Sequence, residues 1–253
     1  MTSSSRTFDL LGTSLLAIDY DELIALCQRL TSAAGASVVD FTNTHIVTLR
    51  RQDTHFRAIT RDVDYFVPDG MPLIWCLNAQ QAELRDRVYG PTFMRRCLRA
   101  TPAPWKHYLL GGSAEVGRRL RERFPEVQFV GSFHGKCAND GQLASAEEDA
   151  VLAEIARLSP DFIWVGLGAP KQYEWIHRYR ARIARGVLLA VGFAFDVNAG
   201  MKKDAPAWMQ RAGLTWAFRA GSEPRRLFGR YLRYNSLFLY YLAHDAIRPP
   251  PSS

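Results

Sequence analysis

The chain alternates between two patterns of apolar residues, one typical of helices and one typical of buried strands. Leu23, Leu26 and Leu30 recur at helical spacing before Gly35, which predicts a helix within residues 18–35. Short runs that are apolar throughout and end near glycine or proline predict strands that are covered on both faces. Such strands are predicted within residues 36–49, 61–70, 105–113, 127–135, 160–172 and 186–200, and further helices within residues 71–81, 87–101, 114–125, 148–159 and 173–184.

The order of these elements predicts the fold class. Strands alternate with helices at roughly thirty-residue spacing, which is typical of a parallel, doubly wound sheet with helices on both faces. We therefore predict a Rossmann-like α/β fold with a mostly parallel sheet. Residues 1–8 are rich in Ser and Thr and are expected to be loose, and the polar stretch 136–149 is expected to be a loop.

The C-terminal part of the chain has a different composition. Residues 202–234 hold eight Lys or Arg against two acidic residues, so most of the formal net charge of +7 lies there. Trp216 and Phe228 are interleaved with the arginines, and the apolar, aromatic stretch 235–247 follows. This balance of charge favours a polyanionic partner such as nucleic acid, anionic lipid or a phosphorylated substrate.

Two kinds of partner suit this basic, aromatic segment. Such segments bind anionic membrane surfaces, and they also suit phosphate contacts and base stacking in nucleic acid. We interpret residues 9–201 as a catalytic domain and residues 202–253 as an appendage for membrane association, with a non-catalytic nucleic-acid-binding module as the alternative. The stretch 235–247 either dips into the membrane or forms a contact within a homo-oligomer. No run of about 18 uncharged apolar residues occurs, so no membrane-spanning helix is predicted.

Several predicted strands end in residues that suit a ligand, and ligands of open α/β sheets bind beyond these ends. Gly111 and Gly112 let backbone amides approach a phosphate, although a tight turn without a ligand fits them equally well. Lys171 can form an ion pair with a phosphate, and the Gln172 amide can bind a sugar or a uracil edge. Other candidates at strand ends are Thr42, Asn43, Asp69, Gly168, Gly192 and Asp196.

Asp69 lies between a predicted strand and a predicted helix, after Pro68 and before Gly70. A carboxylate in this position can cap the helix, or it can act as a general base in a cleft. As a base it would accept the proton that a sugar hydroxyl loses while attacking an anomeric carbon. This role leads us to expect a carboxylate that faces the crevice and is unpaired with any permanent cation.

The chain lacks the motifs of several other enzyme classes. It contains neither a GxGxxG fingerprint nor a P-loop, which disfavours an NAD-type oxidoreductase. Its six histidines show no HxxxH or HExxH spacing and its four cysteines form no CxxC pair, so neither a metal site nor a cofactor is predicted. Scattered free thiols indicate a reducing, cytoplasmic compartment.

Seven motifs connect these features in order: VPDGMPLIW, DRVYGPTF, LLGGSAEVGRRL, FPEVQFVGSFHG, PDFIWVGLGAPKQYEWI, VGFAFDVNAG and APAWMQRAGLTWAFRAGSEPRRLFGRYL. Together they resemble the WecG/TagA/CpsF family of bacterial glycosyltransferases over roughly residues 9–234. The resemblance implies an inverting, metal-independent transfer of a sugar from a nucleotide diphosphate, typically UDP, to a polyprenyl-diphosphate-linked sugar. The reaction would take place at the inner face of the cytoplasmic membrane and feed surface polysaccharides such as exopolysaccharide, capsule, common antigen or teichoic acid. No nucleic-acid partner is then expected.

The resemblance also implies roles for individual residues. Asp69 matches the proposed base, Arg87 matches a cleft arginine, and Gln172 matches an amide that contacts the substrate. Arg219, Arg225, Arg226 and Arg230 match arginines that meet a diphosphate or the membrane. We assign donor binding to Gly111, Gly112, Gly168, Lys171, Gln172 and Asp196, and the substrate cleft to Thr42, Asn43 and Arg87.

The chain departs from the family pattern around the cleft. Where the family has Thr-x-Asn, this chain has the run from Asp40 to Thr42, with Asn43 one position later. The family's PKQE is PKQY here, and the Asp that follows RVxG is replaced near Thr92. The family's Arg before Ala-Pro is Asp204, and its Glu before Trp is Thr215. These changes leave the donor sugar open between N-acetylmannosamine, its uronic acid and a hexose such as glucose.

Overall fold

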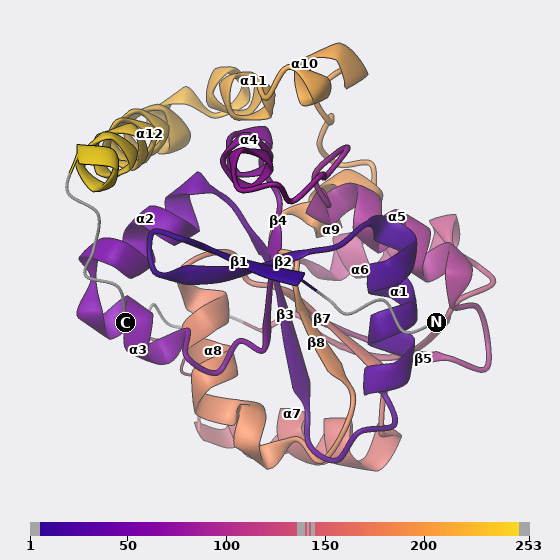
Figure 1. Ribbon diagram of the computed structural model, residues 1–253. Coiled ribbons are helices and arrows are strands. Elements are labelled where there is room, and N and C mark those ends of the chain that lie inside the picture. The colour runs from indigo at the N-terminus through magenta and orange to yellow at the C-terminus, as the bar shows by residue number, and fades with distance from the viewer. Residues whose placement is uncertain (1–5, 136–139, 141, 143–144, 248–253) are drawn as a thin grey trace.

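The computed structural model describes residues 6–135, 140, 142 and 145–247, which are built around one central sheet (Figure 1). The strands in this part of the chain are β1 (Arg6–Leu10), β2 (Thr13–Ala17), β3 (Ser37–Thr42), β4 (Tyr65–Pro68), β5 (Lys106–Gly111), β6 (Gln128–Phe133), β7 (Phe162–Gly166) and β8 (Val187–Ala190). Their order in the sheet is β1-β2-β4-β3-β8-β7-β5-β6. β1 and β2 pair antiparallel, and the other neighbours pair parallel. The predicted Rossmann-like, mostly parallel sheet is confirmed.

Helices cover both faces of this sheet (Figure 1). They are α1 (Tyr20–Leu30), α2 (Thr44–Gln52), α3 (Thr54–Ile59), α4 (Met71–Ala79), α5 (Gly90–Ala100), α6 (Ala114–Arg123), α7 (Ser145–Leu158), α8 (Lys171–Tyr179) and α9 (Ala194–Asn198), followed by α10 (Ala207–Arg211), α11 (Thr215–Ser222) and α12 (Pro224–Ile247). One apolar core includes side chains of α2, α3, α4, α7 and α8. A second core includes side chains of α1, α5, α6 and α9.

The inner strands are apolar at consecutive positions because successive side chains enter opposite cores. In β7, Ile163 packs into the first core and Trp164 into the second, and Leu188 and Leu189 of β8 divide in the same way. All four side chains are fully buried. This two-sided burial explains why unbroken apolar runs mark these strands in the sequence.

The N-terminal segment forms a hairpin. β1 pairs with β2 along its whole length, and the turn between them places Leu11 and Gly12 at positive φ angles of 54° and 79°. The expectation of a loose segment is therefore wrong for residues 6–8, while residues 1–5 lie outside the described part of the chain.

The strand predicted within residues 186–200 is shorter than expected. β8 ends at Ala190, Gly192 turns the chain at a φ of +53°, and α9 follows. Asp196 consequently lies on a helix and not on a strand. The left-handed turn at Gly192 is the physical reason for the break, because such a φ angle ends extended pairing.

The helix predicted within residues 87–101 begins later than expected, at Gly90. The preceding residues run beside the end of β4, where Val88 donates its backbone N–H to the Pro68 carbonyl at 3.0 Å. This contact places Arg87 and Tyr89 next to the residue that follows β4.

α10, α11 and α12 form an arc that passes over α4 and reaches α2 (Figure 1). The Arg51 guanidinium on α2 donates two hydrogen bonds to Asp245 on α12, at 2.8 and 3.0 Å. The Thr44 hydroxyl bonds the Asn235 side chain at 2.9 Å, and Phe238 is buried in the first core. Polar and apolar contacts thus fix α12 to the sheet domain, and the division at residue 202 stays an interpretation.

Within the helices that the structure describes, none combines the length and the apolar character needed to span a bilayer. Cys27, Cys76 and Cys97 are free thiols, as predicted. Cys137 and most of the predicted loop 136–149 lie outside the described residues.

Candidate active site

A cavity of about 660 Å³ opens at the carboxyl ends of the parallel strands. Its wall is built from the segments that follow β3, β4, β7 and β8, and residues of α11 and α12 complete it. Doubly wound proteins bind ligands at this edge of the sheet. The C-terminal helices therefore form one side of a site whose other side belongs to the sheet.

Most of the candidate residues named from the sequence meet at this cavity. Those on its wall are Asn43, Asp69, Arg87, Gly168, Gln172, Gly192, Asp196, Arg219, Arg226 and Arg230. Those that do not line it are Thr42, Gly111, Gly112, Lys171 and Arg225.

Three of the residues away from the wall have structural contacts of their own. The Thr42 side chain is fully buried and donates a hydrogen bond to Asp40 Oδ2 at 2.6 Å. Gly111 and Gly112 have positive φ angles of 98° and 73°. A Cβ at Gly111 would lie 3.0 Å from the carbonyl carbon of Gly166, so glycine allows β5 and β7 to approach closely at their ends. Donor binding by the glycine pair stays a prediction.

Asp69 lies directly after β4, and its side chain is 14% exposed at the cavity wall. Oδ2 accepts a hydrogen bond from the Gly90 N–H at 3.1 Å, whereas Oδ1 is buried and has no hydrogen-bond partner among the described residues. Burial raises the pKa of Asp69 from its ordinary 3.8 to about 7, against the opposing effect of Arg87. A carboxyl group with this pKa is a strong proton acceptor that is still ionised in part near neutral pH.

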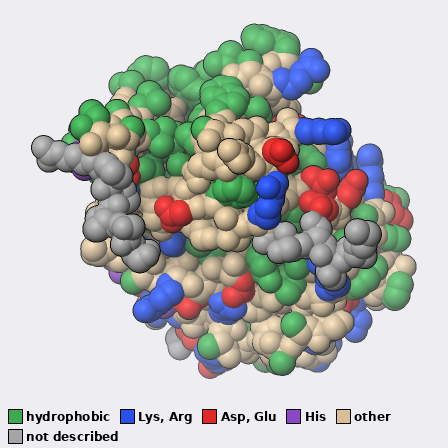
Figure 2. Space-filling view, in the orientation of Figure 1, with side chains coloured by type: hydrophobic (Ala, Val, Ile, Leu, Met, Phe, Trp, Pro, Cys, Tyr) green, Lys and Arg blue, Asp and Glu red, His purple; other side chains and the backbone are tan. Residues whose placement is uncertain are grey.

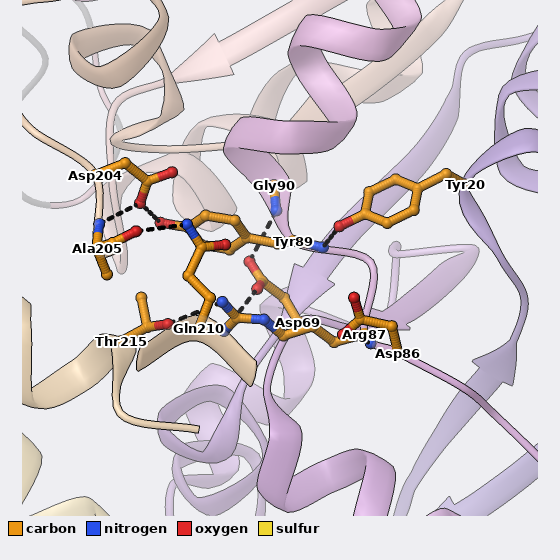
Figure 3. A network of polar contacts seen from close by, with 10 residues as sticks. All are labelled: Tyr20, Asp69, Asp86, Arg87, Tyr89, Gly90, Asp204, Ala205, Gln210 and Thr215. Atoms are coloured by element: carbon orange, nitrogen blue, oxygen red, sulfur yellow. Dashed lines mark hydrogen bonds and ion pairs between the residues drawn. The ribbon is translucent and has the colours of Figure 1, made fainter. Parts of the chain in front are cut away.

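The expectation that Asp69 has no permanent cationic partner is wrong, because the Arg87 guanidinium lies beside it (Figure 3). Arg87 Nη1 is 3.9 Å from Asp69 Oδ1, which is beyond hydrogen-bond range. Nη2 of the same side chain donates to the Thr215 hydroxyl at 2.8 Å. The guanidinium also lies over the Tyr89 ring, 4.3 Å from its centroid. Its charge therefore acts on Asp69 without occupying Oδ1.

A second buried carboxylate lies beneath the cavity. Asp40 on β3 is fully buried, and burial raises its pKa to about 6. Its Oδ1 accepts a hydrogen bond from the Tyr173 hydroxyl at 2.7 Å. The negative charge of Asp40 contributes to the raised pKa of Asp69. Next to Tyr173, Gln172 lines the cavity and is 5% exposed, and its Oε1 is buried without a hydrogen-bond partner among the described residues.

Cationic side chains line the opposite side of the cavity. Arg219 lies over the Phe193 ring, 3.6 Å from its centroid. Lys202 bridges the carboxylates of Asp196 and Glu223, at 3.1 and 2.9 Å. Arg226 also donates to Glu223, at 2.6 Å. Together with Arg230, these four cations exceed the two carboxylates by two, so this side carries net positive charge where an anionic ligand such as a diphosphate would bind.

Sequence reasoning missed several residues of the wall, among them His45, Tyr89 and Lys202. Tyr89 lies inside the DRVYG motif and Lys202 belongs to the basic run, so both carried a signal. His45 carried none. Burial, with a smaller effect of the Arg230 charge, lowers the pKa of His45 to about 4, which keeps its imidazole neutral at physiological pH. Among the described side chains, no group of three or more His, Cys, Asp or Glu is placed to hold a metal ion.

The sequence model of the glycosyl transferase WecG/TagA/CpsF family matches residues 8–251. The chain belongs to this family. It is therefore a glycosyltransferase, as the ordered motifs predicted, and this assignment replaces the alternatives of a non-catalytic nucleic-acid-binding module and an NAD-type oxidoreductase.

Relatives of this glycosyltransferase are found in Staphylococcus aureus. The protein of strain MRSA252 is 30% identical over 215 residues, which cover 83% of this chain and 78% of the relative. The proteins of strains MW2 and NCTC 8325 / PS 47 are 29% identical over the same length and the same shares. All three are named N-acetylglucosaminyldiphosphoundecaprenol N-acetyl-beta-D-mannosaminyltransferase.

The raised pKa of Asp69 predicts a pH-dependent loss of stability. Because the folded glycosyltransferase holds this proton more tightly than the unfolded chain, the linked stability is present below the ordinary pKa of 3.8 and is lost as the pH rises through about 7. Asp69→Asn cannot ionise. It should raise the free energy of unfolding by about 2–4 kcal/mol at pH 8 and change it little at pH 4.

Denaturant unfolding followed by tryptophan fluorescence at both pH values measures this difference. Asp149→Asn is the matched control, since that side chain is 80% exposed, and it should show no comparable pH dependence. Equal effects of Asp69→Asn at pH 4 and pH 8 would contradict the raised pKa.

Proposed function

We propose that this glycosyltransferase moves a sugar, with inversion, from a nucleotide diphosphate donor, UDP-linked by preference, to a polyprenyl-diphosphate-linked sugar. The observation behind the proposal is the pairing of one cavity-lining carboxylate that is incompletely hydrogen-bonded with several arginines on the facing wall. Asp69 supplies the first, and Arg219, Arg226 and Arg230 supply the second. A group transfer from a diphosphate needs both: a proton acceptor and positive charge for the leaving group.

The relatives support the class of substrates. Their name describes an acceptor in which N-acetylglucosamine is linked through a diphosphate to undecaprenol, and a transferred N-acetylmannosamine. We extend the lipid-linked acceptor and an N-acetylhexosamine donor to this chain. The departures at Asp204, Thr215 and Tyr173 lie in or next to the cavity wall, and they keep a hexose such as glucose as the alternative donor sugar.

In the proposed step, the acceptor hydroxyl attacks the anomeric carbon from the face opposite the leaving group. The new C–O bond forms as the bond between the anomeric carbon and the diphosphate oxygen breaks, which inverts the configuration. The Asp69 carboxylate takes the hydroxyl proton, and the electron pair of the broken bond goes to the nucleoside diphosphate. The arginines of α11 and α12 stabilise the charge that develops there.

Asp69 and the arginines come from opposite walls, so the reacting groups lie between the sheet edge and the C-terminal helices. Gln172 and Asn43 on the sheet side offer hydrogen bonds to sugar or base. Asp196 and Gly168 lie on the same wall and complete the proposed donor site.

We also propose that the C-terminal helices rest on the inner face of the cytoplasmic membrane. Hydrophobic side chains gather on the outer surface over α10, α11 and α12 (Figure 2). Trp208, Phe228 and Leu232 are 60%, 57% and 60% exposed. Arginines lie among them, which suits an anionic bilayer surface. A lipid-linked acceptor would then reach the cavity from the membrane, and the product would enter a surface polysaccharide.

Removal of the base should stop transfer. Asp69→Asn should lower the rate of sugar transfer about 100-fold or more, because amide nitrogen and oxygen replace the proton acceptor, while donor binding persists. Mass spectrometry of a polyprenyl-diphosphate-linked acceptor measures the product, with Asp149→Asn as the control that removes an exposed carboxylate. Full activity of Asp69→Asn would refute the assigned base.

Two adjacent arginines on α12 offer a matched pair for donor binding. Arg226 lines the cavity and Arg225 does not. Arg226→Ala should weaken binding of the donor about tenfold or more, because a charge-assisted contact to phosphate is lost, whereas Arg225→Ala should leave it unchanged. A thermal-shift screen of UDP-, GDP- and dTDP-sugars selects the donor, and calorimetry then measures its affinity. Equal losses in both variants would contradict the placement of the diphosphate.

The membrane proposal predicts a loss of vesicle binding. The double variant Phe228→Ser/Leu232→Ser should sediment less with vesicles that contain anionic lipid, because both exposed side chains would otherwise enter the interface. Neither residue lines the cavity, so transfer to a short-chain, water-soluble acceptor should persist as the control. Unchanged sedimentation would count against this surface.

A further inference from the structure

The C-terminal segment contacts the surroundings of Asp69 at two points (Figure 3). The Thr215 hydroxyl, at the start of α11, accepts a hydrogen bond from Arg87 Nη2 at 2.8 Å. The Asp204 carboxylate accepts a hydrogen bond from the Tyr89 hydroxyl at 2.7 Å. Arg87 and Tyr89 both belong to the extended segment before α5. Two parts of the chain that are far apart in sequence therefore share the environment of the base.

These contacts hold Arg87 at a defined distance from the base. Arg87 is 5% exposed, lies over the Tyr89 ring and is tied to Thr215. Its Nη1 remains 3.9 Å from Asp69 Oδ1. A direct charge-assisted hydrogen bond would measure about 2.7–2.9 Å, so the guanidinium stops about 1 Å short of one. Asp69 Oδ1 consequently has no hydrogen-bond partner among the described residues.

We propose that Thr215 is a positioning residue that keeps the Arg87 guanidinium out of a contact ion pair with Asp69, so that the carboxylate stays basic enough to take the acceptor proton. The inference rests on the proposed function of Asp69. Arg219 lies one turn further along α11 and lines the cavity. Packing of α11 against the sheet domain would therefore hold Arg87 away from Asp69 and would also place Arg219 at the cavity.

Several groups besides Arg87 act on the charge of Asp69, and they come from different elements. Burial has the largest effect on its pKa, and Arg87 has the next largest. The others are the Gly90 N–H and Arg219, which lower the pKa, and Asp40, which raises it. Tyr20 and Tyr89 also face Asp69, and burial raises the pKa of both phenols so that they stay neutral.

Loss of the Thr215 hydroxyl should let Arg87 close on Asp69. Nη2 would become a buried donor without an acceptor, and the unpartnered Asp69 Oδ1 is the acceptor at hand. A contact ion pair favours the charged carboxylate, so the pKa of Asp69 would fall and the carboxylate would become a weaker base. This response differs from simple damage to the fold, because it moves a titration as well as a rate.

The pH profile of kcat in Thr215→Val and Thr215→Ser tests this role. In the wild type the acidic limb should fall near pH 7, the pKa of Asp69. In Thr215→Val the limb should move about one pH unit lower and the plateau should drop about tenfold, whereas Thr215→Ser should keep the wild-type profile. Thr48→Val is the control, because it removes a hydroxyl contact to α12 that does not involve Arg87, at 3.5 Å from the Tyr234 carbonyl.

An unshifted limb in Thr215→Val, or an equal shift in Thr215→Ser, would overturn the inference. Thr215→Ala removes the same hydroxyl with less bulk and should shift the limb in the same direction if valine is not accommodated. A second measurement needs no substrate: stability lost between pH 4 and pH 8 should be smaller in Thr215→Val than in the wild type, and equal losses would contradict the role. A fully active Asp69→Asn would overturn the proposed base itself, whereas an inactive Asp69→Asn with an unshifted Thr215→Val would overturn only this inference.

Discussion

The site depends on a carboxylate that is removed from water without being fully paired. Gly90 satisfies one oxygen of Asp69, and the other oxygen has no hydrogen-bond partner among the described residues. Removal from water without full hydrogen bonding destabilises the charged form of the carboxyl group, which raises its pKa to about 7. The same feature gives the side chain its chemical value, because a carboxylate with a raised pKa is a stronger base toward a substrate hydroxyl.

The sheet makes this arrangement possible. β4 delivers Asp69 to the edge where parallel strands end, and the Val88 to Pro68 hydrogen bond holds the next segment alongside it. That segment brings Arg87 close enough for its charge to oppose the effect of burial on the pKa of Asp69. α11 and α12 then add the facing wall with its arginines. The proposed chemistry therefore needs both the sheet domain and the C-terminal helices.

Local patterns in the sequence predicted the sheet and much of the wall, because two-sided burial and strand-end positions are local properties. Unbroken apolar runs marked strands such as β7, and the strand-end rule selected Asp69 and Gln172. The Arg87–Thr215 contact joins residues 128 positions apart, and no local pattern encodes it. In the sequence, a glycine such as Gly111 looks the same whether it allows close packing or contact with a ligand. Only the structure shows the packing, because a Cβ at Gly111 would lie 3.0 Å from the carbonyl carbon of Gly166.

The whole site rests on Asp69 as a buried, incompletely paired carboxyl group whose pKa lies near neutral pH. A ¹³C NMR titration of the aspartate carboxyl carbons measures this pKa, with the Asp69 signal identified by its absence in Asp69→Asn. The expected midpoint for this signal is about pH 7. A midpoint at or below the ordinary value of 3.8 would contradict it.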